Sequence, residues 1–302
     1  MLSGERIVVT GAAGQIGFPL ADYLARDNEV VGVARLRDEE TRARLVAAGI
    51  KPTPVDLASG DLDDIPSDAT YVVHLAAYMA PGEDFDLALR VNAEGTGLLL
   101  QHCRSAKAAL VMSTHSVYRP HDDPMHVFAE TDPLGEVHAG HSPTYSMSKI
   151  GQEAVARTFA RAFGLPVTLA RMNVSYGPNG GLAAYHLDSV AAGYPVTARF
   201  DPAPYSPIHQ DDINEQTEAL LAAASVPATI VNWAGDEVVT VQDWCALGAE
   251  LSGREANVVV KVSAGKPRGQ IADVTRRLSL TGPCKVPWRE GMTATFRARH
   301  PS

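Results

Sequence analysis

The chain has little of what marks secreted, membrane-spanning or disulfide-stabilised proteins. Its three cysteines, Cys103, Cys245 and Cys284, lie far apart and form no CxxC pair, so neither a disulfide framework nor a redox motif is expected. The first residues, MLSGERIVVTG, lack the basic and then apolar pattern of a signal peptide. No apolar run approaches the ~18 residues that a membrane span needs. We therefore expect a cytoplasmic protein without a membrane partner.

Basic charge is also scarce. The sequence of 302 residues holds 26 Lys and Arg against 35 Asp and Glu, a formal net charge of −9. Because a polyanion-binding surface needs a basic excess, this balance argues against DNA or RNA as a main partner. The net negative charge does not argue against a local basic pocket for a phosphorylated small molecule. Hydrophobic residues make up 45% of the chain and charged residues 20%, so a large folded core is expected.

Short runs rich in Val and Ile alternate with helical patterns through the first half of the chain. Strands are expected at residues 6–10, 29–34, 71–75 and 109–113, with helices over 16–26, 38–48, 84–107 and 143–163. This alternation predicts an α/β fold with a doubly wound parallel sheet, the Rossmann arrangement. After residue 175 Pro and Gly cluster and the elements shorten. We expect a dinucleotide-binding domain over 1–175 and a smaller C-terminal α+β substrate lobe over 176–302, with interleaved elements.

A glycine-rich stretch, GAAGQIG, directly follows the first expected strand and opens a helix. Glycines at this point let the backbone turn tightly and approach a pyrophosphate, while the helix N-terminus points its free N–H groups at that anion. The strand–turn–helix context favours a dinucleotide site over a plain tight turn. The expected cofactor contacts here are Gly11, Ala13, Gly14, Gln15, Ile16 and Gly17.

The second expected strand bears on the choice of cofactor. An NAD enzyme usually places Asp or Glu at its end to hold the adenosine 2′-hydroxyl, but this chain has Ala34 there, followed by Arg35 and Arg37. A guanidinium suits a 2′-phosphate, because it offers paired donors and a fixed charge. The pattern favours NADP over NAD, although the two arginines could also be ordinary exposed residues. Asp56 and Leu57 are further candidates, with the carboxylate facing the adenine amino group.

The sequence Tyr145-Ser-Met-Ser-Lys149 lies at the head of an expected helix. A spacing of four residues puts the Tyr and Lys side chains on one helix face. A phenol with a pKa of ~10 is a poor base at neutral pH, and a neighbouring ammonium favours the phenolate. Tyr145 could then exchange the proton of a secondary alcohol while a nicotinamide exchanges the hydride. The run STHSVY ends an expected strand, where a hydroxyl would face the same cleft and bind the substrate oxygen.

At this point the sequence resembles the extended short-chain dehydrogenase/reductase family, also called the NAD-dependent epimerase/dehydratases. The shared motifs occur in the expected order and span nearly the whole chain. They are TGxxGxxG at 10–17, HLAA at 74–77, VNAEGT at 91–96, STHSVY at 113–118, PTYSMSK at 143–149, RMNVSYGP at 171–178 and IHQDDI at 208–213. The tail, WREGM at 288–292, resembles the start of the family's final helix.

The resemblance implies roles for particular residues. Tyr145 would be the general acid/base, Lys149 would bind the ribose and lower the tyrosine pKa, and Thr114 would donate to the substrate oxygen. The helices at 84–107 and 144–163 would pair across a two-fold axis, which implies a homodimer. The remaining implied contacts are Leu75, Ala76 and Ala77 beside the cofactor, Asn92 near the nicotinamide, and Asn173 on the substrate or nicotinamide side.

The sequence also departs from the family pattern. Sugar-nucleotide dehydratases of the family carry Asp-Glu after the strand-end Thr, where this chain has His115 and Ser116; both are candidate substrate contacts, although His115 could equally pack under a flap. Residues 200–206 lack the arginine that would hold a diphosphate. Arg268 or Arg199 could replace it, and Arg268 is our candidate. These departures argue against a 4,6-dehydratase and weaken a nucleotide-sugar substrate.

Histidines gather at positions 121, 126, 138 and 141, in a spacing that matches no familiar ligand set. We expect a polar flap there and no metal. Two classes of function remain. The first is an NAD(P)-dependent oxidoreductase or epimerase acting at a secondary alcohol or ketone, either nucleotide-sugar epimerase-like or an NADP-dependent reductase of a smaller carbonyl compound. The second is a non-catalytic cofactor-sensing protein, but such proteins usually lose the Tyr or Lys that this chain keeps.

Overall fold

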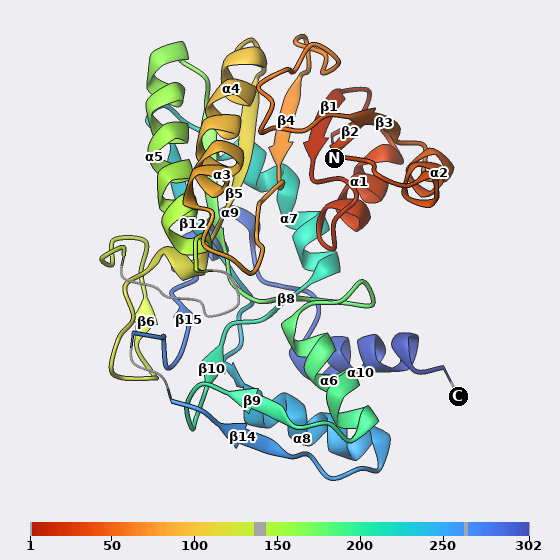
Figure 1. Ribbon diagram of the computed structural model, residues 1–302, viewed down its shortest axis with the longest axis vertical. Helices are drawn as coiled ribbons and strands as arrows, with labels where there is room; N and C mark the ends of the chain where they lie inside the picture. Colours follow the sequence, from red (N-terminus) through yellow and green to blue (C-terminus); the bar gives the residue numbers. More distant parts are fainter. Residues whose placement is uncertain (1, 136–142, 263–264, 302) are drawn as a thin grey trace. The chain divides into compact units, whose positions relative to one another are not determined.

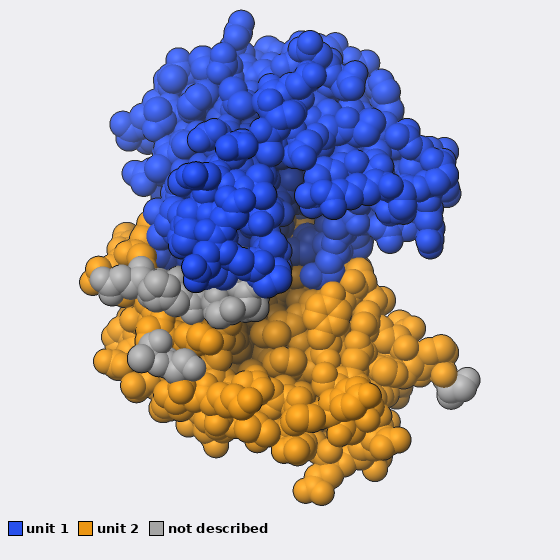
Figure 2. Space-filling view, in the orientation of Figure 1, with its two compact units in different colours: residues 1–117, 139–170, 214–231 blue, residues 118–138, 171–213, 232–302 orange. Residues whose placement is uncertain are grey.

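A computed structural model describes residues 2–135, 143–262 and 265–301 (Figure 1). The chain divides into two compact units (Figure 2). Unit 1 comprises residues 1–117, 139–170 and 214–231, and unit 2 comprises 118–138, 171–213 and 232–302. Each unit is therefore assembled from three segments that alternate along the sequence.

A seven-stranded parallel sheet forms the centre of unit 1, with strand order β12-β7-β5-β4-β1-β2-β3. β1 pairs in parallel with both β2 and β4, β2 with β3, and β4 with β5. The central strands are largely apolar because both faces of the sheet are covered there; all seven residues of β5 are buried. The doubly wound fold class is confirmed. The strands are β1 (Arg6–Thr10), β2 (Glu29–Ala34), β3 (Lys51–Pro54), β4 (Tyr71–His74), β5 (Ala108–Thr114), β7 (Val167–Met172) and β12 (Thr229–Trp233).

Helices cover the sheet, with α1 packed against β1 and β2 and with α4 beside α5 (Figure 1). Val8 and Val72 of the sheet share one buried core with Leu99 of α4 and Ala156 of α5. The helix expected over 84–107 is interrupted, because a π-helical turn separates α3 from α4. The bounds are α1 (Gly17–Ala25), α2 (Glu39–Ala47), α3 (Phe85–Leu89), the π-turn η1 (Arg90–Glu94), α4 (Gly95–His102), the 3₁₀ turn η2 (His115–Val117) and α5 (Tyr145–Phe163).

Unit 2 combines short helices with two-stranded ribbons. α6, α8 and α10 pack on one another around a core that includes Trp244, Leu187 and Met292. The strands are β6 (Val127–Phe128), β8 (Ser175–Tyr176), β9 (Val196–Ala198), β10 (Pro204–Tyr205), β11 (Ile208–His209), β13 (Val239–Thr240), β14 (Val258–Val260) and β15 (Ile271–Ala272). The helices are α6 (Leu182–Ala192), α8 (Val241–Ser252), α9 (Thr275–Thr281) and α10 (Trp288–Arg299), and α7 (Gln210–Ala222) continues from unit 2 into unit 1.

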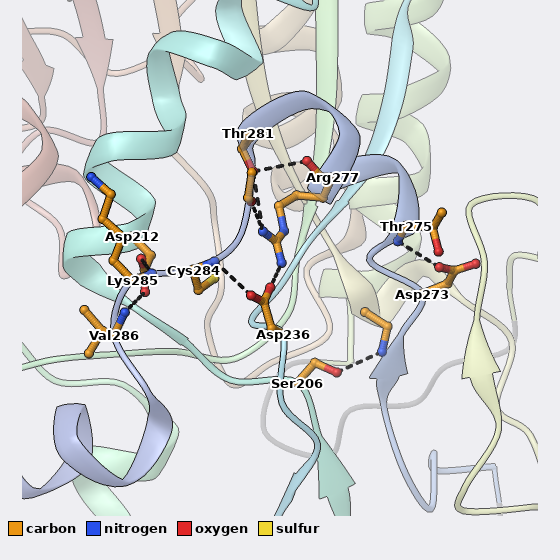
Figure 3. Close-up of polar contacts among 12 residues, drawn as sticks. Ser206, Asp212, Asp236, Asp273, Thr275, Arg277, Thr281, Cys284, Lys285 and Val286 are labelled. Carbon is orange, nitrogen blue, oxygen red and sulfur yellow. Dashed lines mark hydrogen bonds and ion pairs between the residues drawn. The ribbon is translucent and has the colours of Figure 1, made fainter.

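An ion pair between the buried Arg277 and the partly exposed Asp236 holds the segment after α9 (Figure 3). The Arg277 side chain is fully buried; its guanidinium pairs with Asp236 and donates to the Gly282 carbonyl at 2.7 Å. Asp236 also accepts from the Cys284 backbone N–H at 2.8 Å, and Asp212 accepts from Lys285 N–H at 2.6 Å. Two carboxylates thereby satisfy backbone donors that would otherwise be costly to bury.

In the part of the chain that the structure describes, every helix is too short or too polar to cross a membrane.

Candidate active site

The glycine-rich turn between β1 and α1 requires its glycines. Gly11 has a φ of +70°, and a Cβ there would lie 2.9 Å from the Ala76 backbone nitrogen. A Cβ on Gly17 would lie 2.1 Å from the Gly11 carbonyl oxygen. Gly14 N–H donates to that same oxygen at 2.8 Å. The turn is therefore closed on itself by backbone contacts that side chains would break.

The beginning of α1 suits an anion. Its first turn carries no acidic residue, so the N–H groups and the positive end of the helix dipole can serve a pyrophosphate. Arg44 of α2 adds a cation beside the turn, since its guanidinium donates to the Ala13 carbonyl at 3.1 Å and stacks over the Phe18 ring. The backbone N–H donors of this turn, and the space that its glycines leave because they have no side chain, fit a dinucleotide. Gln15 and Ile16 lie within this turn.

Two arginines follow the end of β2, and the nearest carboxylate, Asp38, is already hydrogen-bonded. Arg35 and Arg37 are both exposed. Asp38 caps α2 by accepting from Thr41 N–H at 2.7 Å. Farther along, the exposed Asp56 accepts from Ala58 N–H at 3.0 Å in its own turn, while Leu57 is buried against Gly95.

The end of β4 is tied to the turn by one hydroxyl. Thr10 Oγ1 accepts from the N–H groups of Leu75 and Ala76, both at 3.2 Å, and Ala77 follows as an exposed residue. Asn92, in the π-turn η1, clamps the backbone of Tyr78: its Oδ1 accepts from Tyr78 N–H at 2.6 Å and its Nδ2 donates to Tyr78 O at 3.0 Å. The expected backbone segment beside the cofactor is thus held in place from both sides.

The end of β5 separates the two neighbouring hydroxyls. Ser113 donates to the buried Glu153 at 2.5 Å, whereas hydrogen bonding by Thr114 lowers the pKa of the Tyr145 phenol. Thr114 Oγ1 also accepts from Ser116 N–H at 3.2 Å. Alternation along the strand sends these side chains to opposite faces, so Thr114 is the hydroxyl that meets the tyrosine. His115 is buried, with 2% of its surface exposed.

Tyr145 and Lys149 are both held by β5. Burial raises the pKa of Tyr145, and the Thr114 hydrogen bond lowers that pKa by a smaller amount. Lys149 Nζ donates to the Met112 carbonyl at 2.7 Å. Burial lowers the pKa of Lys149 to about 7, although the charge of Glu153 raises that pKa. Burial is the larger of these two effects on the tyrosine pKa, and the lowering of that pKa by the Lys149 ammonium stays a prediction.

The remaining candidates belong to unit 2. Asn173 Nδ2 donates to the Gln270 carbonyl at 2.7 Å, and its Oδ1 accepts from Val174 N–H at 2.9 Å. Arg268 donates to the Asp122 carbonyl at 2.6 Å, pairs with the Asp122 carboxylate at 3.1 Å and stacks over the Phe200 ring. Both side chains therefore make structural contacts within their own unit.

The histidine-rich stretch in unit 2 is partly described. The rings of His121 and His126 stack with centroids 4.0 Å apart, and His126 Nε2 lies 2.8 Å from Asp132. His138 and His141 lie outside the described residues. Among residues 2–135, 143–262 and 265–301, the structure shows no cluster of three His, Cys, Asp or Glu able to hold a metal ion.

Several residues that build this site lie within the family motifs, and the sequence alone predicts no role for them. Thr10, His74 and Thr96 form a buried chain of contacts, and Ser148 accepts from Asn92 Nδ2 at 2.8 Å. Polar residues inside otherwise apolar motifs are the signal that could have identified them, because buried polar groups are nearly always hydrogen-bonded.

Comparison with known proteins gives this geometry a family. The profile of the NAD dependent epimerase/dehydratase family matches residues 7–197. The uncharacterized UDP-glucose epimerase YtcB of Bacillus subtilis is 25% identical over 300 residues, 91% of each chain. The dTDP-D-glucose 4,6-dehydratase of Dictyostelium discoideum is 27% identical over 194 residues, which are 58% of this chain and 44% of that protein. The D-erythronate dehydrogenase of Cupriavidus necator is 34% identical over 114 residues, 32% of this chain and 34% of that one.

The chain spans less than half the length of the Dictyostelium dehydratase. Among solved structures, the UDP-glucuronic acid 4-epimerase of Bacillus cereus, in complex with UDP-glucuronic acid and NAD, superposes with a TM-score of 0.83. It is 23% identical, and the match covers 97% of this chain and 98% of that one, which shows a shared fold. With residues 7–197 matched by the family profile, the chain belongs to the NAD-dependent epimerase/dehydratase family and is an enzyme that uses a nicotinamide cofactor.

Proposed function

We propose that this chain is an epimerase-like oxidoreductase that exchanges a hydride at a secondary alcohol or ketone of a nucleotide sugar. The observation that carries the proposal is the placement of the start of α5 against the end of β5, where Lys149 Nζ donates to the Met112 carbonyl at 2.7 Å and Thr114 is close enough to the Tyr145 phenol to lower its pKa. Two hydroxyl groups from different elements thereby meet beside the buried Lys149. A carbinol oxygen placed between them would have a proton acceptor and a hydrogen-bond donor at once.

The bound nicotinamide would supply the hydride transfer. Tyr145 would take or return the carbinol proton, and Thr114 would hold the oxygen in line with the phenol. Lys149 would supply positive charge close to the phenol, which favours its ionised form. Glycines 11, 14 and 17 would hold the pyrophosphate at the beginning of α1.

The nucleotide-sugar substrate is supported by YtcB, which matches over 91% of both chains, and by the fold shared with the Bacillus cereus epimerase. To test it, the purified chain with NAD or NADP would be incubated with UDP-glucose, UDP-glucuronic acid and dTDP-glucose. We expect a change in sugar configuration, detected by NMR, without net change in nicotinamide absorbance. Reactions without cofactor are the control. Conversion of none of the three would contradict the nucleotide-sugar assignment.

A second candidate is an NADP-dependent reductase or dehydrogenase of a smaller carbonyl compound. It is favoured by the lack of arginine in residues 200–206 and by the engagement of Arg268 with Asp122 and Phe200. The similarity to D-erythronate dehydrogenase points the same way. This candidate predicts a net change in nicotinamide absorbance with a small hydroxy acid, and that readout separates the two.

We propose NADP as the preferred cofactor, because exposed Arg35 and Arg37 follow β2 and the nearby Asp38 is engaged in capping α2. The neighbouring structure holds NAD, so the preference is a property to be tested on this chain. Titration calorimetry should show tighter binding of NADP than NAD. The Arg35→Ala/Arg37→Ala variant should lose about tenfold or more in NADP affinity, the value of one charged hydrogen bond, with NAD affinity nearly unchanged.

Arg42→Ala is the matched control, because Arg42 is another partly exposed arginine close in sequence and pairs with Glu39 on its own helix. Tighter binding of NAD than NADP to the unmodified protein would overturn the NADP preference.

A further inference from the structure

His74 ends β4 and is completely buried, yet both of its ring nitrogens have partners. Nδ1 lies 2.6 Å from Thr10 Oγ1, and Nε2 lies 2.7 Å from Thr96 Oγ1. Thr10 immediately precedes the glycine-rich turn, and Thr96 lies in the first turn of α4. One imidazole therefore bridges two threonines that belong to different parts of unit 1.

The Thr10 hydroxyl fixes the direction of the first contact. Its oxygen already accepts from the N–H groups of Leu75 and Ala76. A hydroxyl has two acceptor positions and one proton; with Ala76 N–H on one position and Leu75 N–H shared between the other and the Thr10 carbonyl, the proton of Thr10 is directed to His74. Nδ1 of His74 is therefore the acceptor and carries no proton.

The Thr96 hydroxyl fixes the second contact independently. It donates to the Asn92 carbonyl oxygen at 2.7 Å, which can only accept, and it accepts from Gln152 Nε2 at 3.0 Å. Its remaining lone pair must accept from His74, so Nε2 of His74 carries the proton. Both threonines assign the same neutral tautomer. Burial, with the positive charge of Lys149 added, lowers the pKa of His74 to about 3, so the ring stays neutral at physiological pH.

The two sides of the imidazole lead to different parts of the site. The Thr10 side holds the backbone at Ala76, against which Gly11 packs without room for a Cβ. The Thr96 side holds the π-turn at Asn92 and contacts Gln152 of α5. Asn92 in turn donates to Ser148, and Ser148 donates to the Tyr145 carbonyl at 3.0 Å. An unbroken series of hydrogen bonds thus joins the phosphate-binding turn to the helix of the proposed acid/base.

We propose that His74 is a positioning residue that couples the glycine-rich turn after β1 to the helix α5. Its Nδ1 acts on the turn through Thr10, and its Nε2 acts on the helix through Thr96. The helix half of this role rests on the proposed function, since it assumes that Tyr145 acts on the substrate. The turn half requires only that the protein binds a nicotinamide cofactor.

Two amide variants separate the halves. In His74→Asn the amide oxygen can occupy the Nδ1 position, which keeps the Thr10 contact and removes the Thr96 contact. In His74→Gln the amide nitrogen can reach the Nε2 position, which keeps the Thr96 contact and leaves the Thr10 proton without an acceptor. We expect His74→Gln to weaken cofactor binding about tenfold with kcat at saturating cofactor nearly unchanged. We expect His74→Asn to lower kcat about tenfold with cofactor Kd nearly unchanged, each being the effect of one buried hydrogen bond.

Equal effects of the two variants on Kd and kcat would overturn the coupling role and leave His74 a structural residue. Thr10→Val provides a second arm that leaves His74 in place. Because it already removes the Thr10 contact, adding His74→Gln to it should cause no further loss of cofactor affinity, whereas additive losses would contradict the proposal. These Kd measurements need no substrate, so they stand even if the proposed reaction fails.

The tautomer can be tested on the unmodified protein, with a variant needed only to assign the signal. NMR of the protein with ¹⁵N-labelled histidine should show that Nε2 of His74 carries a proton at neutral pH and that Nδ1 carries none. The His74 signal is assigned by its loss in His74→Asn. A protonated Nδ1 would overturn the proposal directly.

Discussion

The Tyr145→Phe variant is expected to lose about 1,000-fold in kcat, because the side chain keeps its ring and loses the only proton that it can exchange. The aliphatic hydroxyl of Thr114 is a much weaker acid than a phenol, so Thr114 would not replace Tyr145 as the acid or base at neutral pH. Cofactor affinity should change little, since the glycine-rich turn is untouched. Steady-state kcat and calorimetric Kd, measured on the same preparation, separate the two effects.

Matched variants make this result specific. Tyr194→Phe removes a hydroxyl from a residue that is 67% exposed, and it should leave kcat unchanged. Thr114→Val should lower kcat by removing the donor, and Thr114→Ser should restore much of that loss. Turnover by Tyr145→Phe within tenfold of the unmodified protein would show that another group carries the proton.

Much of the sheet could be predicted because buried parallel strands are continuous runs of Val and Ile. The strand expected at 29–34 coincides with β2. The sequence does not predict β3, because KPTP carries two prolines, which argue against a central strand. β3 instead forms the edge of the sheet, where a missing N–H is tolerated. Only the tertiary position of the segment makes it a strand.

The break in the helix expected over 84–107 could not be predicted from apolar periodicity. The π-turn η1 contains polar Asn92, whose partners Tyr78 and Ser148 lie 14 and 56 residues away. A periodic pattern records which face is buried and contains no information about distant hydrogen-bond partners. Such turns frequently lie at functional sites, and this one lies between the cofactor segment and α5.

The candidate site was predictable as a set of residues and less so as a set of interactions. The spacing of Tyr145 and Lys149 places them on one helix face. It does not reveal that the Lys149 ammonium donates to the Met112 carbonyl of β5. Nor does it show that Thr114, rather than Ser113, meets the phenol. Both facts depend on how α5 packs against the end of β5, which is a tertiary property.

Replacing Lys149 with methionine is expected to abolish most activity and to stabilise the fold at acidic pH. Methionine has nearly the same length and can fill the buried position. Burial lowers the pKa of Lys149 from 10.5 to about 7. Below pH 7 the folded state therefore contains a buried ammonium, which is less favourable there than in water. Loss of that buried charge should raise the free energy of unfolding by about 1–3 kcal/mol at pH 6, because tenfold in proton affinity is worth about 1.4 kcal/mol.

The pH dependence follows from the sign of the shift. Between pH 7 and about 10.5 the unfolded lysine binds a proton and the folded lysine does not, so the stability of the unmodified protein rises with pH in this window. The advantage of Lys149→Met should therefore be constant below pH 7 and shrink above it. Chemical denaturation at pH 6, 7, 8 and 9 measures this difference, with Lys261→Met, at an exposed lysine, as control. Parallel curves for Lys149→Met and the unmodified protein would mean that Lys149 keeps its proton throughout, and that the ammonium of Lys149 is then available to the phenol at every working pH.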